Sequence, residues 1–135
     1  MPPETKKSRS IFLVDDDKFL LDMYSVKFKG VGCAVDSSSD PAAALQKLRD
    51  GFSPDVILLD IVMPSVSGFE FLETLRKENL AKSSVVIMLS NQGAQEDIDK
   101  AKSLGAAGFI VKATSIPSEV LEQAFSIADG VGAAK

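Results

Sequence analysis

Short runs of apolar residues alternate along this chain with segments in which apolar residues recur at helical spacing. The run Val56–Leu59 is the clearest, because every position in it is apolar and turn-forming residues bound it. A short run of this kind predicts a strand that is buried on both faces, as strands are in parallel sheets covered by helices. Further strands are predicted at residues 11–14, 31–35, 85–89 and 109–111.

The stretches between these runs carry signals for helices. Asp40-Pro41 predicts a helix start, because aspartate is a favourable N-cap residue and proline suits the first helical turn. Gly30, Gly51 and Gly105 stand where glycine in a left-handed conformation can end a helix. The predicted helices cover residues 18–29, 41–50, 68–79, 94–104 and 117–128.

This alternation predicts an α/β fold. Right-handed crossovers between apolar parallel strands favour a flavodoxin-like, doubly wound sheet of five strands in the order 2-1-3-4-5, with five helices. A chain of 135 residues predicts one domain with a single core. We expect that domain to span residues 10–129, between a disordered tail at 1–9 and a frayed tail at 130–135, with no output domain.

Composition excludes several kinds of site. Cys33 is the only cysteine and histidine is absent, so an internal disulfide is impossible and a zinc site lacks its usual ligands. The net charge of −4 disfavours direct binding to nucleic acid. Because no apolar stretch is long enough for a membrane span or a signal-peptide core, we expect a cytoplasmic protein.

Polar side chains follow the predicted strands and should gather at one edge of the sheet: Asp15, Asp16, Asp60, Ser90 and Lys112. Neighbouring carboxylates either share protons or hold a cation, and oxygen ligands of this kind favour Mg²⁺. A carboxylate beside such an ion can attack a phosphoryl group and form an acyl phosphate. Lys112 would offset the charge of that group, and Ser90 would donate a hydrogen bond to one of its oxygens.

From Arg9 to Ala128 the chain resembles the response-regulator receiver domains of two-component signalling, of the single-domain chemotaxis-regulator type. The resemblance rests on Asp15-Asp16, on the segment Leu58–Pro64 with Gly68, on Ser90 and on Lys112. Spacings of 44, 30 and 22 residues separate Asp16, Asp60, Ser90 and Lys112. Each piece alone is a weak signal, but their order is specific.

The resemblance implies a role for each residue of the acidic site. Asp60 matches the aspartate that accepts the phosphoryl group, and Asp16 matches a direct Mg²⁺ ligand. Asp15 matches a ligand that acts mostly through water, and the backbone carbonyl of Val62 completes the metal shell. The protein would then not be an enzyme in the usual sense, since it catalyses only its own phosphorylation and dephosphorylation.

The resemblance also implies partners. Ser90 matches the switch hydroxyl, Lys112 the lysine that contacts phosphate, and Phe109 the switch aromatic. The phosphoryl donor is a sensor histidine kinase or a histidine phosphotransfer protein, and no membrane contact is implied. The output partner is a protein that reads the face of the fourth helix, fifth strand and fifth helix. Acidic residues on that face argue against DNA binding there: Glu96, Asp97, Asp99, Glu119 and Glu122.

Two residues depart from the family pattern. Ala113 stands where the family usually has a proline in a cis linkage, and a cis bond to another residue costs about 2.5–4 kcal/mol. Asn91 is bulkier than the small residue often found after the switch hydroxyl. These departures leave a second interpretation open, in which the protein is a docking module that does not respond to phosphate.

The acidic cluster itself is compatible with different chemistry. Asp15-Asp16-Asp17 is similar to the first motif of haloacid-dehalogenase-type phosphatases, with Asp15 as nucleophile and Asp17 as acid. Phe19 stands where that family usually has threonine or valine, and no acidic pair follows Lys112. The aspartates can also simply cap a helix, which is the expected role of Asp17. A flavin-binding module is disfavoured, because these carboxylates would repel its phosphate.

Overall fold

The computed structural model of the protein describes residues 9–63, 65–112 and 116–133. Within these residues, five strands alternate with five helices. The strands are β1 (Ser10–Val14), β2 (Ala34–Ser38), β3 (Val56–Asp60), β4 (Val85–Ser90) and β5 (Gly108–Val111). The helices are α1 (Lys18–Gly30), α2 (Pro41–Arg49), α3 (Gly68–Glu78), α4 (Gln95–Ser103) and α5 (Pro117–Ala133).

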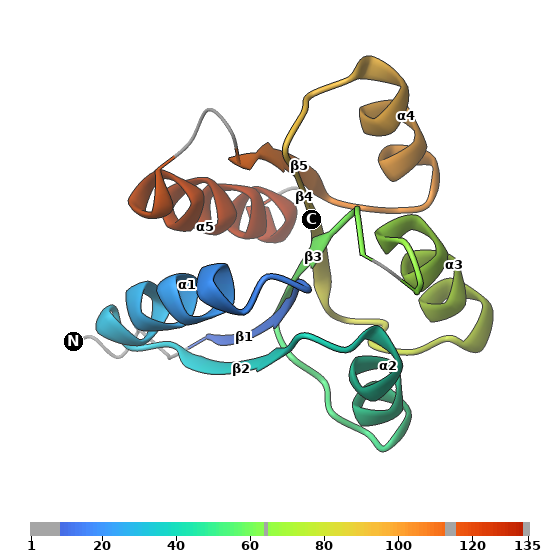
Figure 1. Ribbon diagram of the computed structural model, residues 1–135, viewed down its shortest axis with the longest axis horizontal. Helices are drawn as coiled ribbons and strands as arrows, with labels where there is room; N and C mark the ends of the chain where they lie inside the picture. The colour runs from blue at the N-terminus through green and yellow to red at the C-terminus, as the bar shows by residue number, and fades with distance from the viewer. Residues whose placement is uncertain (1–8, 64, 113–115, 134–135) are drawn as a thin grey trace.

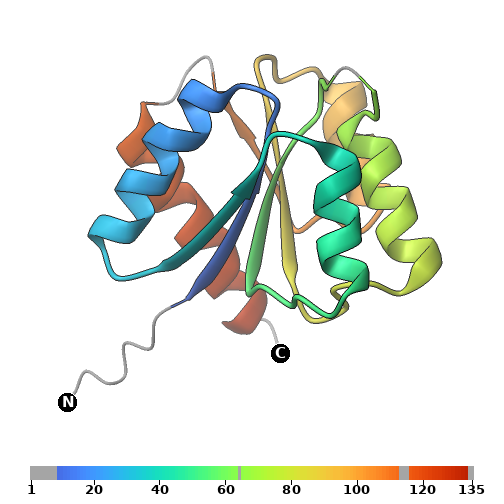
Figure 2. The same ribbon diagram turned by 60° about the horizontal axis from the view of Figure 1, so that its bottom comes forward.

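The strands form one sheet in the order β2-β1-β3-β4-β5, and every neighbouring pair is parallel. Helices α1 and α5 cover one face, while α2, α3 and α4 cover the other (Figure 1). Figure 2 shows the carboxyl ends of the strands at the top of the view, where each strand leads into the following helix. The predicted α/β fold and the predicted strand order are therefore confirmed.

The core has two halves, one on each side of the sheet, and the alternation of side chains along each strand divides it. In β3, Ile57 and Leu59 belong to the half covered by α2, α3 and α4. Val56 and Leu58 belong to the half covered by α1 and α5. All four are at most 1% exposed, which confirms that this strand is buried on both faces.

The residues predicted to begin or end helices do so in α2 and α4. The Asp40 carboxylate accepts a hydrogen bond from the Ala42 N–H at 3.1 Å, and Pro41 opens α2. Gly51 and Gly105 have positive φ angles of 110° and 90° after α2 and α4. Asn79 ends α3 in the left-handed region, with φ of 56°.

The prediction for the second strand was wrong by about three residues. It was placed at residues 31–35, but β2 begins at Ala34, which pairs with Ser10. Helix α1 runs through Gly30, and the positive φ angle falls on Gly32, at 93°. The Cys33 N–H bonds to the Phe28 carbonyl at 3.1 Å, so residues 31–33 form the end of the helix and are not available for the strand.

Both ends of the described chain pack together near the amino ends of the strands. The Arg9 guanidinium forms an ion pair with Asp129 and lies 5.3 Å from the centre of the Phe125 ring. Helix α5 continues past Asp129 to Ala133, although it contains Gly130 and Gly132. Glycine costs about 1 kcal/mol in a helix but does not prevent it. Residues 1–8 and 134–135 of the predicted tails, and Ala113, lie outside the described residues.

A helix that crosses a bilayer needs about 20 predominantly apolar residues, and the described helices differ from this requirement. None of them combines the necessary length with sufficient hydropathy.

Candidate functional site

Lys112 links two buried carboxylates at the carboxyl edge of the sheet. Its ammonium nitrogen lies 3.1 Å from an oxygen of Asp15 and 3.0 Å from an oxygen of Asp60. Asp15 is 2% exposed and Asp60 is 5% exposed, so both ion pairs of the ammonium group are shielded from solvent. Residues 97 and 52 positions apart in the sequence thus meet at one site.

The strand register brings these side chains together. Val14 ends β1 opposite Leu59 of β3, so the next residues, Asp15 and Asp60, both emerge at the same edge. Lys112 directly follows β5, which ends at the same edge of the sheet. Because parallel strands end together, the topology alone is enough to collect these three groups.

Asp17 has a different role from its acidic neighbours. Its carboxylate accepts hydrogen bonds from the N–H groups of Phe19 and Leu20, at 3.0 and 3.2 Å, and so caps α1. This confirms the capping role predicted for Asp17. The Asp17 N–H in turn donates to Asp15 at 3.0 Å, which fixes the orientation of the Asp15 carboxylate.

The pKa values of the buried site reflect both burial and the charges of Asp15, Asp60 and Lys112. Burial, followed by repulsion from Asp15, raises the pKa of Asp60 to about 6. Burial also raises the pKa of Asp15, against the opposing effects of the Asp17 N–H and of Lys112. Burial by itself would lower the pKa of Lys112, but the two carboxylates outweigh burial and raise it. One lysine therefore compensates the two buried carboxylates only in part.

The donor atoms fit a hard divalent cation. Asp15, Asp16 and Asp60 each offer a carboxylate oxygen, and these atoms lie within 4.8 Å of one another. Asp16 is exposed whereas the other two are buried, so the cluster opens to solvent on one side. Oxygen donors with an open side suit Mg²⁺, which binds through few carboxylates and keeps several waters. Val62, two residues after Asp60, lies at the same edge with its side chain 74% exposed.

Ser90 and Phe109 lie on the neighbouring strands β4 and β5. Ser90 ends β4 between β3 and β5, is 6% exposed, and its hydroxyl accepts a hydrogen bond from the Gln92 N–H at 3.2 Å. Phe109 lies in β5 opposite Met88 and is half-buried. Ser90 therefore stands at the predicted edge, one strand from Asp60.

The loop between β3 and α3 is closed at its base by contacts that the sequence did not predict. The Gly68 N–H donates to the Ile61 carbonyl at 2.8 Å. Ser67 and Glu70 form a reciprocal capping box at the start of α3, with hydrogen bonds of 3.2 and 3.1 Å. The sequence signals were Gly68 itself and the Ser-x-x-Glu spacing. Pro64, in the same loop, lies outside the described residues.

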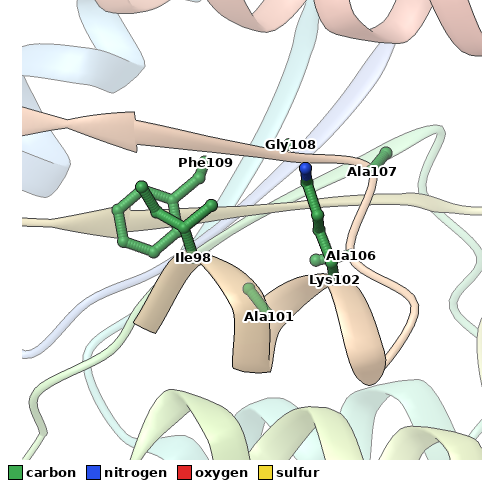
Figure 3. A pocket seen from close by; sticks show the side chains of 7 residues that line it. All are labelled: Ile98, Ala101, Lys102, Ala106, Ala107, Gly108 and Phe109. Atoms are coloured by element: carbon green, nitrogen blue, oxygen red, sulfur yellow. The ribbon is translucent and has the colours of Figure 1, made fainter. Parts of the chain in front are cut away.

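A second feature missed from the sequence is a cavity of about 40 Å³ between α4 and β5. In Figure 3 the side chains of Phe109 and Ile98 lie together, and the Lys102 side chain extends from α4 toward Gly108 of β5. The other residues that line the cavity have small side chains, and this run of small residues was the sequence signal for it: Ala101, Ala106, Ala107 and Gly108. The cavity thus gives the Phe109 ring a neighbouring space.

Comparison with known proteins identifies the family whose sequence pattern this chain shares. Residues 11–124 match the response regulator receiver domain family. The phosphate regulon transcriptional regulatory protein PhoB of Escherichia coli is 30% identical over 114 residues, which are 84% of this chain and 49% of PhoB. Protein PilG of Pseudomonas aeruginosa is 30% identical over 102 residues, 76% of this chain and 75% of PilG. The chain spans about half the length of most of the curated relatives that it matches.

Solved structures show the same similarity. The chemotaxis response regulator CheY4 of Vibrio cholerae superposes with a TM-score of 0.81 and 28% identity, covering 90% of this chain and 99% of that one. A CheY-like receiver domain from Methanospirillum hungatei superposes with a TM-score of 0.82 and 25% identity, covering 96% of this chain and all of that one. With its fold and its match over residues 11–124, the chain belongs to the response regulator receiver domain family of two-component signalling.

Proposed function

We propose that this protein is a phosphorylation-controlled switch in which Asp60 accepts a phosphoryl group from a phosphohistidine on a partner protein. The observation that carries the proposal is the contact of Lys112 with both Asp15 and Asp60, beside the carboxylate of Asp16. Asp15, Asp16, Asp60 and the carbonyl of Val62 would hold Mg²⁺. When bound, this ion would offset negative charge on the phosphoryl oxygens.

The transfer step balances with the groups available. An oxygen of the Asp60 carboxylate forms a bond to phosphorus, while the bond between phosphorus and the donor's imidazole nitrogen breaks. The electron pair of that bond stays on the ring, which takes a proton from solvent and leaves as neutral histidine. Lys112 offsets charge on the acyl phosphate and Ser90 donates a hydrogen bond to it. These 135 residues contain no histidine, so a phosphohistidine donor lies outside them, and a sensor kinase or a phosphotransfer protein would supply it.

Phosphorylation supplies enough free energy for a switch. It adds a charge of about −1.5 to −2, and each charge-assisted hydrogen bond is worth about 1.5–3 kcal/mol. Inverting a population ratio of about 1:99 takes about 5.5 kcal/mol, so two or three such contacts suffice. We expect the change to reach Phe109 and the surface of α4, β5 and α5, where a partner protein would read it.

The test is intact mass after incubation with acetyl phosphate, with and without Mg²⁺. We expect one added phosphoryl group that requires Mg²⁺ and is absent from Asp60→Asn. Asp17→Asn is the matched control, because asparagine also caps a helix. This variant should still gain one phosphoryl group, whereas a phosphatase that uses Asp17 as its acid would be impaired by the change. An unmodified wild type that is folded and loaded with Mg²⁺ would contradict the proposal and favour the docking module.

A further inference from the structure

Gly68 begins α3 in direct contact with the main chain of Asp60. A Cβ atom at position 68 would lie 2.3 Å from the Asp60 carbonyl oxygen, 0.7 Å inside the 3.0 Å limit that real Cβ contacts respect. It would also lie 2.9 Å from the Cα atom of Ile61. Since these are backbone atoms, no side-chain rotation can make room.

Two backbone hydrogen bonds of Ile61 hold Gly68 against the main chain of Asp60. The hydrogen bond from the Gly68 N–H to the Ile61 carbonyl, at 2.8 Å, ties α3 to the residue after Asp60. The Ile61 N–H bonds in turn to the Leu89 carbonyl at 3.1 Å, which ties the same residue to β4. Asp60 is thus held between a strand and the first turn of α3, which the capping box of Ser67 makes rigid.

The carboxylate of Asp60 depends on this placement more than a surface residue would. Its partners, Asp15 and Lys112, come from other strands, so a shift of the Asp60 backbone changes its distances to both. The burial of Asp60, at 5% exposed, leaves little space in which the side chain can compensate.

We propose that Gly68 is a positioning residue for phosphoryl transfer: the absence of a side chain at position 68 sets the place of the Asp60 carboxylate relative to Asp15, Asp16 and Lys112. This inference rests on the proposed function. Gly68 itself touches neither the metal site nor the phosphoryl group, and acts only through the main chain of Asp60 and Ile61.

The sign of the effect of a Gly→Ala substitution distinguishes a positioning role from a change in helix stability. Alanine is a better helix former than glycine, so Gly→Ala at a helix position with free space is neutral or stabilising. Gly30, in the last turn of α1, has no atom within 4 Å of an added Cβ and provides the matched control. A loss in Gly68→Ala that is absent from Gly30→Ala must come from the contact with Asp60.

The experiment compares Gly68→Ala, Gly30→Ala and Ser67→Ala with wild type. We measure the maximal rate of phosphorylation by acetyl phosphate, the donor concentration at half that rate, Mg²⁺ affinity by calorimetry, and the urea midpoint of unfolding. We expect Gly68→Ala to lower the maximal rate by about 10- to 100-fold, the size expected for a misplaced reacting group, with weaker Mg²⁺ binding. The half-saturating donor concentration should change less than the rate. Ser67→Ala should lower the urea midpoint but reduce the rate much less than Gly68→Ala, because it loosens the first turn of α3 without filling the contact.

The outcomes distinguish this inference from the proposed function. A folded Gly68→Ala that is phosphorylated and binds Mg²⁺ like wild type would overturn the role of Gly68 and leave the function intact. A wild type that binds Mg²⁺ but accepts no phosphoryl group would overturn the function, while the Mg²⁺ affinity of Gly68→Ala still tests the placement of Asp60. If Gly68→Ala does not fold, amide resonances of wild type decide: the Gly68 resonance should shift at the same Mg²⁺ concentration as that of Asp60, and an unmoved Gly68 would refute the coupling.

Discussion

At the scale of single residues, the balance between Lys112 and its two carboxylates governs the site. The ammonium group contacts Asp15 and Asp60 within 3.1 Å, yet the pKa of Asp60 is still raised to about 6, by burial and by Asp15. Lys112 therefore offsets the charge of the two buried carboxylates only in part. An added cation, or the loss of one negative charge, should therefore stabilise the protein.

Asp60→Asn tests this balance through pH. A carboxyl group whose pKa is raised in the folded state favours folding when protonated, and this contribution is lost as the pH rises from about 3.8 through about 6. Without Mg²⁺, we expect the free energy of unfolding of Asp60→Asn minus that of wild type to increase over this range and then level off. Urea unfolding at several pH values measures the difference.

Glu78→Gln is a control of opposite sign. The hydrogen bond from Arg49 lowers the pKa of Glu78, so this group stabilises the folded state above the usual pKa and loses that contribution as the pH falls. The free energy of unfolding of Glu78→Gln minus that of wild type should therefore decrease as the pH rises. Parallel slopes for the two variants would contradict the interpretation of Asp60.

At the scale of elements, α4 is the helix with the fewest anchors among those described. Ala101 is its only buried residue, and its N-cap residue, Ala94, provides no side-chain hydrogen bond. Its carboxyl end is held by Arg76 of α3, which donates to the carbonyls of Leu104 and Gly105 at 2.9 and 2.8 Å. We infer that α4 is fixed mainly at its carboxyl end.

Arg76→Gln should loosen α4. We expect the free energy of unfolding to fall by about 1 kcal/mol, as for the loss of exposed hydrogen bonds, and amide hydrogen exchange to become faster in α4 than in α3. Hydrogen exchange read out by mass spectrometry checks both helices at once.

Arg49→Gln is the matched control for this variant. It removes another exposed arginine, whose guanidinium bonds to Glu78 across α2 and α3 and does not contact α4. Faster exchange in α4 for both variants would show that the effect is general, and would refute the specific tie through Arg76.

At the scale of the whole molecule, the proposed metal site depends on folding of the entire domain. Asp16, Asp60 and Lys112 come from early, middle and late parts of the sequence and meet because three strands end at one edge of the sheet. A ligand that binds only the folded state stabilises it by an amount set by its concentration and affinity. Mg²⁺ bound at the proposed site would therefore be linked to unfolding of the entire domain.

We predict that Mg²⁺ raises the free energy of unfolding, by about 2.7 kcal/mol at a hundredfold excess over its dissociation constant. Asp16→Asn should abolish most of this gain, because it removes the exposed ligand of the cluster. Asp22→Asn, which changes an exposed aspartate on α1 outside the cluster, should keep it. Equal Mg²⁺ effects in these two variants, measured by urea unfolding, would exclude Asp16 as a ligand.

Much of the fold could be predicted because its signals are local. The apolar run of β3, the Asp40-Pro41 start of α2 and the cap of Asp17 depend on neighbours a few residues away, and each prediction was confirmed. The start of β2 was predicted wrongly because two glycines, Gly30 and Gly32, compete to end α1. That choice depends on hydrogen bonds over several residues, which spacing alone does not reveal.

The order of the helices and strands could be predicted from the sequence alone, as could the polar residues that follow the strands: Asp15, Asp16, Asp60, Ser90 and Lys112. The periodicity of burial and the termination of helices are properties of short segments, so the linear chain contains them. Tertiary packing sets three further properties: how far the pKa of Asp60 is raised, how closely Gly68 approaches the Asp60 main chain, and which end of α4 is held. These depend on distances between segments remote in sequence, and such distances exist only once the core has packed.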